Sequence, residues 1–496
     1  MSDPVVRTPA GPVLGEAFEH GTVFRAVPYA APPVGELRFQ PPAGVAPWTE
    51  IRDARQVGAT APQSAESSEL LPNVMIAGDD YLHVNVWTPD VSGSAPVVVF
   101  IHGGAFVTGS NALSGYDGST FARDGVVFVS VNYRLGADGF LWYGDGVANL
   151  GLLDQVAALT WVRDSIAAFG GDPESVTVMG ESAGAMSVGA LMTMPAAQGL
   201  FHRAIMESGA GHHSISPAGA LKVGKRLASA LGVAATRDAV AAADLGELIA
   251  AQTKVSAQLG KSPFRRTWGD VATNLMPFEP VIDGEVLPQL PIRAIENGAG
   301  REIDVLVGYN TQEGRLFFAE LPDRGLKTRL VTLVISRLFG LGRKDRAAYR
   351  SWAANDYETL VALLTDAVYR IPALNLAEAH GRAHVYRFSW ESPALNGRLG
   401  ASHAMELPYV FDNLADPNWK ALLGGPGSQS IATQMHAAWI EFAKTGTPGW
   451  PRTRPDASRW SSATAPPSKP TSTHPAEPSG PAAVNPAHVA SGRPKN

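Results

Sequence analysis

Hydrophobic residues in the first half of the chain form short runs with two kinds of spacing. Pro96–His102 and Gly125–Tyr133 are almost continuously apolar, which is typical of strands buried on both faces. Leu152–Val162 places its apolar residues at helical spacing, and Val176–Gly180 is again a short apolar run. Buried strands that alternate with helices favour an α/β fold with a mostly parallel sheet.

The flanking segments extend this pattern. Leu82–Thr88 alternates apolar and polar residues, which predicts a strand, and residues 4–50 hold short apolar pairs between turns, which predicts an antiparallel start. Further strands are expected at Ala204–Gly209, Phe278–Pro288, Asp304–Asn310 and Val385–Ser389. Helices are expected within residues 217–260 with a break at Gly232, within 325–380, and at Gln434–Ala443 before Gly446 and Pro448.

The composition is that of an ordinary globular protein. The chain has 496 residues, of which 45% are hydrophobic and 17% are charged, and its net charge is −6. Length alone suggests two or three domains. The small net charge gives no reason to expect nucleic acid or an anionic membrane as a partner.

The absence of cysteine from the sequence excludes disulfides, zinc–thiolate sites and thiol nucleophiles. Met1–Thr8 lacks the basic and apolar regions of a secretory signal, and Val97–Ile101 is too short to span a bilayer. We therefore expect a cytoplasmic protein that does not enter a membrane.

The last part of the chain differs from the rest. Residues 461–496 contain eight prolines and no Leu, Ile, Phe, Tyr or Trp, so they cannot bury enough apolar surface to fold. The sequence predicts a folded region over residues 1–455 and a disordered Pro/Ala/Ser-rich tail over 456–496.

Candidate chemistry begins at Val176–Ala185, whose sequence is V-T-V-M-G-E-S-A-G-A. It predicts a strand, a tight turn with Ser182 at its apex, and a helix. A G-x-S-x-G turn of this kind lifts the serine hydroxyl out of the sheet, and the N-terminus of the following helix favours negative charge beside it.

A serine nucleophile needs a base, which is usually a histidine that follows it in this type of sheet. Of the twelve histidines, His403 lies in the loop Gly400–Pro408 after the last predicted strand, at the sheet edge where a base is expected. Histidines in other contexts are set aside, namely His20, His83, His102, His474 and His488.

The carboxylate that would orient this histidine is less clear from the pattern. Glu313 follows the predicted strand Asp304–Asn310 and has the right place in the chain order. Asp304, Asp283 and Glu406 are alternatives that the pattern leaves open. No metal and no cofactor is expected.

Backbone N–H groups must also face the oxygen that becomes negative during acyl transfer. His102–Phe106 follows a buried strand and has small residues, as in the oxyanion loop of lipases and esterases, and Ala183 directly follows the serine.

Several separate stretches resemble one family, the type-B carboxylesterases, which include para-nitrobenzyl esterases and cholinesterases. The resemblance extends in collinear order over roughly residues 5 to 450. The matching stretches are Phe24–Phe39, Asn85–Pro89, His102–Phe106, Asn132–Gly136, Asn149–Gln155, Phe169–Pro173, Gly180–Ala185, Phe278–Gly284, Asn310–Gly314 and His403–Leu407.

This resemblance implies a serine carboxylesterase with the α/β-hydrolase fold, in one large domain with helical insertions over the active site. It assigns the nucleophile, acid and base to Ser182, Glu313 and His403, and it favours Glu313 over the alternative acids. It assigns the oxyanion donors to Gly104, Ala105 and Ala183. The expected partner is a small-molecule ester, and the chain is expected to be a monomer or a homodimer.

The substrate pocket is only partly defined by the sequence. Side chains next to the predicted catalytic loops are candidates for its wall, namely Phe106, Leu316, Phe317, His212 and His213. The loop Gly103–Phe106 resembles that of esterases that accept bulky alcohols.

The chain departs from the family pattern at three places. Asp79–Leu82 stands where the family often has E-D-C-L, and the Pro-rich tail follows Trp450 and Pro451 where an aromatic-containing segment is usual. Glu207–Gly209 replaces Q-S-G, and we expect Ser208 to pack near the catalytic acid.

Two rival functions remain. The same three residues could hydrolyse carbamates or amides instead of esters. A non-catalytic binding protein of the same fold is the other, although such a protein is expected to lose the serine or the histidine, and both are present here.

Overall fold

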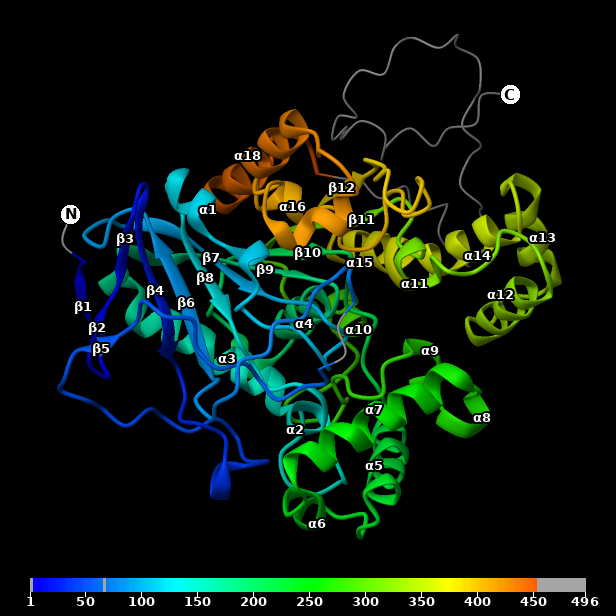
Figure 1. The fold of residues 1–496 in the computed structure, drawn as a ribbon, viewed down its shortest axis with the longest axis horizontal. Helices are drawn as coiled ribbons and strands as arrows, with labels where there is room; N and C mark the ends of the chain where they lie inside the picture. The colour runs from blue at the N-terminus through cyan, green and yellow to red at the C-terminus, as the bar shows by residue number, and fades with distance from the viewer. Residues whose placement is uncertain (1–2, 66–67, 453–496) are drawn as a thin grey trace.

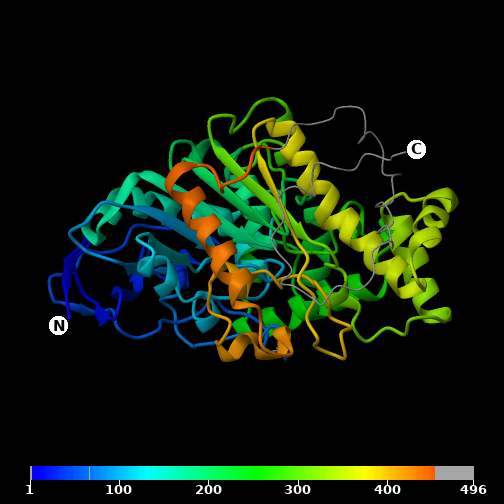
Figure 2. The ribbon, with the colours of Figure 1, turned by 90° about the horizontal axis from the view of Figure 1, so that it is seen from above.

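A computed structural model describes residues 3–65 and 68–452. The tail predicted over residues 456–496 lies outside the described residues. Within them, a nine-stranded sheet crosses the middle of the molecule, with helices on both of its faces (Figures 1 and 2). The structure has the α/β-hydrolase architecture that the sequence predicts.

The strands of the large sheet lie in the order β12-β11-β10-β9-β7-β8-β6-β4-β3. Neighbouring strands from β12 to β8 are parallel, whereas β6, β4 and β3 add antiparallel strands at the opposite edge. The bounds are β3 (Glu16–Phe18), β4 (Gly21–Pro28), β6 (His83–Thr88), β7 (Ala95–Ile101), β8 (Val127–Val131), β9 (Gly171–Glu181), β10 (Arg203–Glu207), β11 (Asp304–Asn310) and β12 (His384–Phe388). A small separate sheet contains β1 (Val5–Arg7), β2 (Pro12–Leu14) and β5 (Arg52–Asp53).

Strand β7 shows why the continuous apolar runs form the centre of the sheet. Val97, Val99 and Ile101 belong to the hydrophobic core on one face, and Val98 and Phe100 belong to the core on the other. Because successive side chains of a strand point to opposite faces, a strand covered by helices on both sides must be apolar at every position.

Helices cover both faces of the sheet. On one side α3 and α4 pack against β9, and on the other α18 packs against β7 and β9. The α-helices are α1 (Ser119–Arg123), α2 (Gly136–Phe140), α3 (Leu150–Ser165), α4 (Ala183–Leu191), α5 (Pro217–Leu231), α6 (Arg237–Ala241), α7 (Leu245–Lys261), α8 (Arg265–Trp268), α9 (Val271–Asn274), α10 (Pro291–Glu296), α11 (Arg315–Phe318), α12 (Leu326–Leu338), α13 (Arg343–Trp352), α14 (Asp356–Leu364), α15 (Ile371–His380), α16 (Leu407–Val410), α17 (Lys420–Leu423) and α18 (Gln429–Thr445). Short 3-10 turns are η1 (Gly35–Leu37), η2 (Ser114–Tyr116), η3 (Ile166–Phe169), η4 (Pro195–Ala197) and η6 (Pro417–Trp419), and η5 (Thr365–Arg370) is a π-helical segment.

The helical insertions form two groups, α5 to α9 at the bottom of Figure 1 and α11 to α14 at its right. The predicted break at Gly232 is confirmed, since this residue ends α5 with φ 73. Gly446 likewise ends α18, with φ 77.

One prediction about strands needs correction. Residues 278–288 do not form a strand, because Val281 makes only an isolated bridge with Ile215. The strand predicted at Leu82–Thr88 is confirmed as β6, and all six of its residues are buried.

One continuous helical run, Asp356–His380, is long and apolar enough to cross a membrane by length and composition. It comprises α14, η5 and α15. In the fold, 67% of its most apolar window is buried inside the protein, as expected for a core helix.

Candidate active site

Ser182 lies at the sharp turn between β9 and α4. Its backbone has φ 54 and ψ −121, a conformation that is strained for a residue with a side chain. A Cβ at position 184 would lie 2.0 Å from the carbonyl oxygen of Ile101, and one at position 180 would lie 2.4 Å from the backbone of Gly184. Gly180 and Gly184 therefore let the turn lie tightly against the end of β7, with Ser182 in the wall of a cleft.

His403 lies on the loop after β12 and is held by Glu313. Its Nδ1 is 2.7 Å from Oε2 of Glu313, and its backbone N–H donates to the carbonyl oxygen of Glu313 at 3.3 Å. The other carboxylate oxygen of Glu313 accepts the backbone N–H of Asn310 at 2.7 Å. This fully buried carboxylate is fixed from both sides, so it orients the imidazole and leaves Nε2 as the nitrogen available to act as a base.

Glu181, the residue before the serine, also faces the imidazole. Its Oε1 is 3.2 Å from Nε2 of His403, and both side chains are 5% exposed. Burial lowers the pKa of His403, but the charge of Glu181, together with the hydrogen bond and charge of Glu313, outweighs this effect and raises the pKa to about 9. Burial raises the pKa of Glu181, and the charge of His403 opposes that rise.

A chain of hydrogen bonds lies next to Glu313. The hydroxyl of Ser208 donates to Oε1 of Glu406 at 3.0 Å, and the side-chain amide of Asn310 donates to the other oxygen of Glu406. Ser208 thus bonds to Glu406 and not to Glu313, the acid beside which the sequence predicted it. Burial and the nearby charge of Glu313 raise the pKa of Glu406 to about 7.

The glycine loop after β7 presents unused backbone donors to the cleft. Gly104 has φ 108 and Ala105 has φ 53, and within the described chain neither N–H donates to another protein group. A Cβ at position 104 would lie 2.1 Å from the carbonyl oxygen of Thr108, so the loop requires glycine there. Ala183 begins α4, where the N–H groups of a helix have no intrahelical acceptor. These are the donors that an oxyanion would need.

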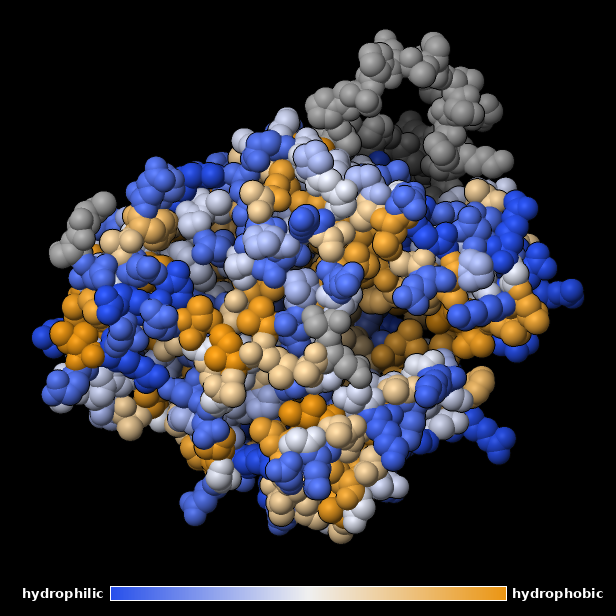
Figure 3. Space-filling model, viewed as in Figure 1, coloured by the Kyte–Doolittle hydropathy of each residue, from blue (hydrophilic) through white to orange (hydrophobic). Residues whose placement is uncertain are grey.

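Ser182 and His403 both line a cleft of about 2310 Å³. Its mouth lies between α11 and α12 on one side and, on the other, the loop before α8 and the end of α9, where Figure 3 shows a hollow bordered by hydrophobic residues. The volume is larger than the roughly 300–1,000 Å³ of most small-molecule pockets. The site can therefore hold a substrate with large groups attached to the reacting carbonyl.

Only some of the predicted wall residues line this cleft. Leu316 and Phe317 do, and the ring of Phe317 is 5.3 Å from that of His403. Phe106 does not, because its turn, with φ 61, directs the fully buried ring against Phe140 at 4.9 Å.

His212 and His213 also lie outside the cleft wall. The N–H of Ile292 in α10 donates to the carbonyl oxygen of Gly211 at 2.8 Å, which fixes the segment after β10 against that helix. Burial lowers the pKa of His212 to about 4 and that of His213 to about 3, so both rings are neutral near pH 7.

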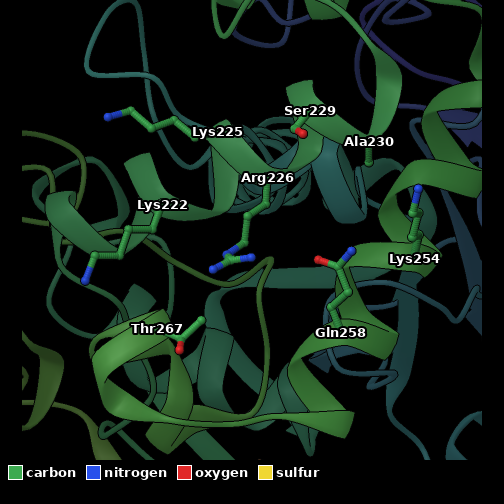
Figure 4. A pocket seen from close by; sticks show the side chains of 8 residues that line it. All are labelled: Lys222, Lys225, Arg226, Ser229, Ala230, Lys254, Gln258 and Thr267. Atoms are coloured by element: carbon green, nitrogen blue, oxygen red, sulfur yellow. The ribbon is translucent and has the colours of Figure 1, made fainter.

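A second pocket of about 370 Å³ lies among α5, α7 and α8 (Figure 4). Arg226 and Gln258 point toward its centre, and the guanidinium of Arg226 stacks over Trp268, 4.2 Å from the ring centre. Its other residues are Lys222, Lys225, Ser229, Ala230, Lys254 and Thr267. Among the described residues, its lining includes no histidine or carboxylate that could activate a hydroxyl.

The sequence pattern gave no role to two residues that contact the imidazole. Glu181 was visible as the second residue of the G-E-S-A-G motif, but its side-chain direction depends on the fold. Tyr369 comes from η5, and its ring lies 4.7 Å from that of His403. Nothing in the local sequence marks a π-helical segment or directs this tyrosine to the site.

The α/β-hydrolases are defined by a parallel sheet with a serine at this turn and an imidazole on a loop beyond a later strand. This class includes enzymes that transfer acyl groups to water. The chain belongs to the carboxylesterase family, whose sequence model matches residues 2–477, and it is a carboxylic ester hydrolase.

Similar proteins agree with this assignment. Para-nitrobenzyl esterase from Bacillus subtilis is 37% identical over 91% of this chain and 93% of its own length. Fumonisin B1 esterase from Sphingopyxis macrogoltabida is 38% identical over 90% and 84%, and phenmedipham hydrolase from Pseudarthrobacter oxydans is 36% identical over 92% and 94%.

Solved structures are similar over the same extent. A para-nitrobenzyl esterase structure matches with a TM-score of 0.80 and 33% identity over 93% of each chain. A carboxylesterase from Geobacillus stearothermophilus matches with a TM-score of 0.76 and 36% identity, over 90% of this chain and 91% of its own.

Proposed function

We propose that Ser182, His403 and Glu313 hydrolyse carboxylic esters through an acyl-enzyme intermediate. The observation that carries this proposal is the 2.7 Å contact between Nδ1 of His403 and the buried carboxylate of Glu313, in the same cleft as the strained turn of Ser182. The contact orients an imidazole that lines the same cleft as the Ser182 hydroxyl, which needs a base.

The reaction follows from these roles. Nε2 of His403 takes the proton of Ser182 as its Oγ attacks the acyl carbon. The N–H groups of Gly104, Ala105 and Ala183 donate to the oxyanion. His403 then gives its proton to the departing alkoxide, the alcohol leaves, and water repeats the sequence to release the acid.

Replacement of the nucleophile tests the proposal. Ser182→Ala should lower kcat for p-nitrophenyl acetate by roughly 10⁴-fold or more, as removal of a nucleophile does in other triads. A fluorophosphonate probe should label the native protein and not this variant. Substantial turnover by Ser182→Ala would refute the assignment.

A carbamate or amide hydrolase on the same residues is the second candidate. The relative named phenmedipham hydrolase, whose named substrate is a carbamate, supports keeping it. A p-nitrophenyl ester and the matching p-nitrophenyl carbamate separate the two, since the enzyme should favour whichever carbonyl its site was selected to attack. The ester is expected to react faster.

The loop around Gly104 supports a further proposal, that bulky alcohols are accepted. We expect turnover of tert-butyl acetate, and no detectable turnover would contradict this. The cytoplasmic location and the oligomeric state, monomer or homodimer, stay predictions that cell fractionation and size-exclusion chromatography with light scattering would test.

A further inference from the structure

One side of the catalytic cleft is lined by the second group of helical insertions. We call this part the helical arm and define it by the apolar side chains that α11, α12 and the loop between them contribute to the cleft wall. These residues include Leu316, Phe317, Leu321, Leu330, Val331 and Val334.

The face of α12 that lines the arm is apolar and only partly covered. Leu330, Val331 and Val334 recur at a spacing of three and four residues, so they share one face of the helix. Leu330 is 51% exposed, and Val331 and Val334 are half-buried, although other residues of the same helix are packed in the fold. Apolar surface facing an open cleft is unfavourable in water, and an apolar ligand that covers it would be stabilised.

Charged groups are few along this wall. Within the described chain, Glu320 and Lys327 are the charged side chains that the segment from α11 to η5 contributes to the cleft. Neither stands between Leu330 and Val334 on the helix face. The arm is therefore suited to a hydrocarbon group and offers little to a charged or strongly polar one.

The arm begins at the catalytic imidazole. The rings of Phe317 and Tyr369 lie 5.3 Å and 4.7 Å from the ring of His403, and they stack with their planes 6° apart. In the proposed reaction His403 donates its proton to the departing alkoxide. The alcohol part of the ester must therefore leave beside this imidazole, at the entrance of the arm.

We propose that the preferred substrates are esters of long or bulky apolar alcohols, with the alcohol part bound in the helical arm. This inference rests on the proposed function, because it uses the proton transfer from His403 to fix which side of the ester enters the arm.

Two series of esters test it. The first holds the acid constant as acetate and lengthens the alcohol from ethyl to octyl, and the second holds the alcohol as ethyl and lengthens the acid equally. Because the arm is open to water, kcat/KM should rise about twofold for each added methylene of the alcohol, against about fourfold for complete burial. Octyl acetate should thus react roughly 16-fold better than butyl acetate, and the acid series should show a weaker dependence.

Variants of α12 then locate the effect. Val334→Trp fills the arm and Leu330→Asp places a charge in it. Each should lower the octyl-to-ethyl ratio of kcat/KM by at least about tenfold, because several methylenes of the octyl group can then no longer be buried in the arm. Leu330 is half exposed, so its substitution does not endanger folding. Arg337→Trp is the matched control, because this exposed residue lies on the same helix outside the cleft wall, and its ratio should equal that of the native protein.

The results separate the two proposals. If Ser182→Ala loses the fluorophosphonate label and acetate turnover, the proposed function stands. If kcat/KM then does not change with the length of the alcohol, the helical-arm proposal alone is overturned. A rise with acid length instead of alcohol length would also overturn it, as would Val334→Trp with an unchanged ratio. Ester turnover that does not depend on Ser182 would overturn the proposed function itself.

Discussion

The carboxylate of Glu181 should control the pH at which the enzyme becomes active. Its Oε1 lies 3.2 Å from Nε2 of His403, the nitrogen that must be free of a proton to act as the base. A negative charge at this distance stabilises the imidazolium. Glu181→Gln keeps the shape of the side chain and removes the charge.

The expected magnitude follows from this distance. Two unit charges 3.2 Å apart interact by about 5 kcal/mol at an effective dielectric constant of about 20, which is an upper limit of between 3 and 4 pKa units. Glu313 and Glu406 also raise the pKa of His403, and both remain in the variant. We expect Glu181→Gln to lower the pKa of His403 by about 1–2 units, since the protein relaxes around the lost charge.

The sign of the effect is fixed by the direction of the shift. The native pKa is raised to about 9, so on the acid side of pH 9 only a small part of the enzyme has a neutral base. Because removal of the charge lowers this pKa, the acid limb of the kcat/KM profile should move to lower pH. Activity at pH 7 should then rise relative to the alkaline plateau of the same variant.

The assay is the pH dependence of kcat/KM for p-nitrophenyl acetate, followed at the isosbestic wavelength of the product and corrected for spontaneous hydrolysis. Glu285→Gln is the control, because it makes the same chemical change at an exposed position outside the cleft and should leave the limb in place. An acid limb of Glu181→Gln that stays in place or moves to higher pH would refute the electrostatic reasoning.

Three further substitutions test other parts of the structure. Glu313→Gln should lower kcat for p-nitrophenyl acetate by roughly 10³–10⁴-fold with an unchanged circular dichroism spectrum, since the amide cannot stabilise the imidazolium of the base. Asp154→Asn breaks the buried ion pair with Arg134, whose charged groups are 2.7 Å apart, and should lower the free energy of unfolding in urea by about 3–5 kcal/mol. Burial raises the pKa of Glu207 well above its usual value, which favours the neutral carboxyl. Glu207→Gln can still accept the N–H of Trp439 and should therefore change Tm by less than about 3 °C, as a neutral isosteric change does.

The fold was predictable from the sequence where one pattern had one meaning. The continuous apolar run of β7 could only be a strand covered on both faces, and the structure confirms it. The alternation in β6 correctly predicted a strand, but its polar residues are buried and bonded. Asn85 accepts the backbone N–H of Ala26 at 2.9 Å and donates to the carbonyl oxygen of Asn111 at 3.0 Å, so a polar residue there does not mark a solvent face.

The candidate site was predictable where the chemistry is carried by a motif, and less so where it depends on packing. The sequence could nominate Glu313 and His403 because the chain order of such residues is constrained by the sheet. It could not predict that Phe106 points away from the cleft, since the direction depends on a positive φ in one turn. The contact of Tyr369 with the imidazole joins segments 34 residues apart, and its geometry is set by the π-helical η5.

Several carboxyl groups are buried together around the serine turn, and they differ in the groups that contact them. Burial raises the pKa values of Glu181, Glu207 and Glu406, and the charge of His403 opposes this rise at Glu181 and Glu406. Glu313 is as deeply buried, but its two oxygens are held by the backbone N–H of Asn310 and by His403. These two contacts hold the carboxylate that faces Nδ1 in one orientation. Oxygens that lack such donors, as in Glu181, can take up or release a proton as the imidazole changes charge, and this is why the pH profile of Glu181→Gln would report on the whole cluster.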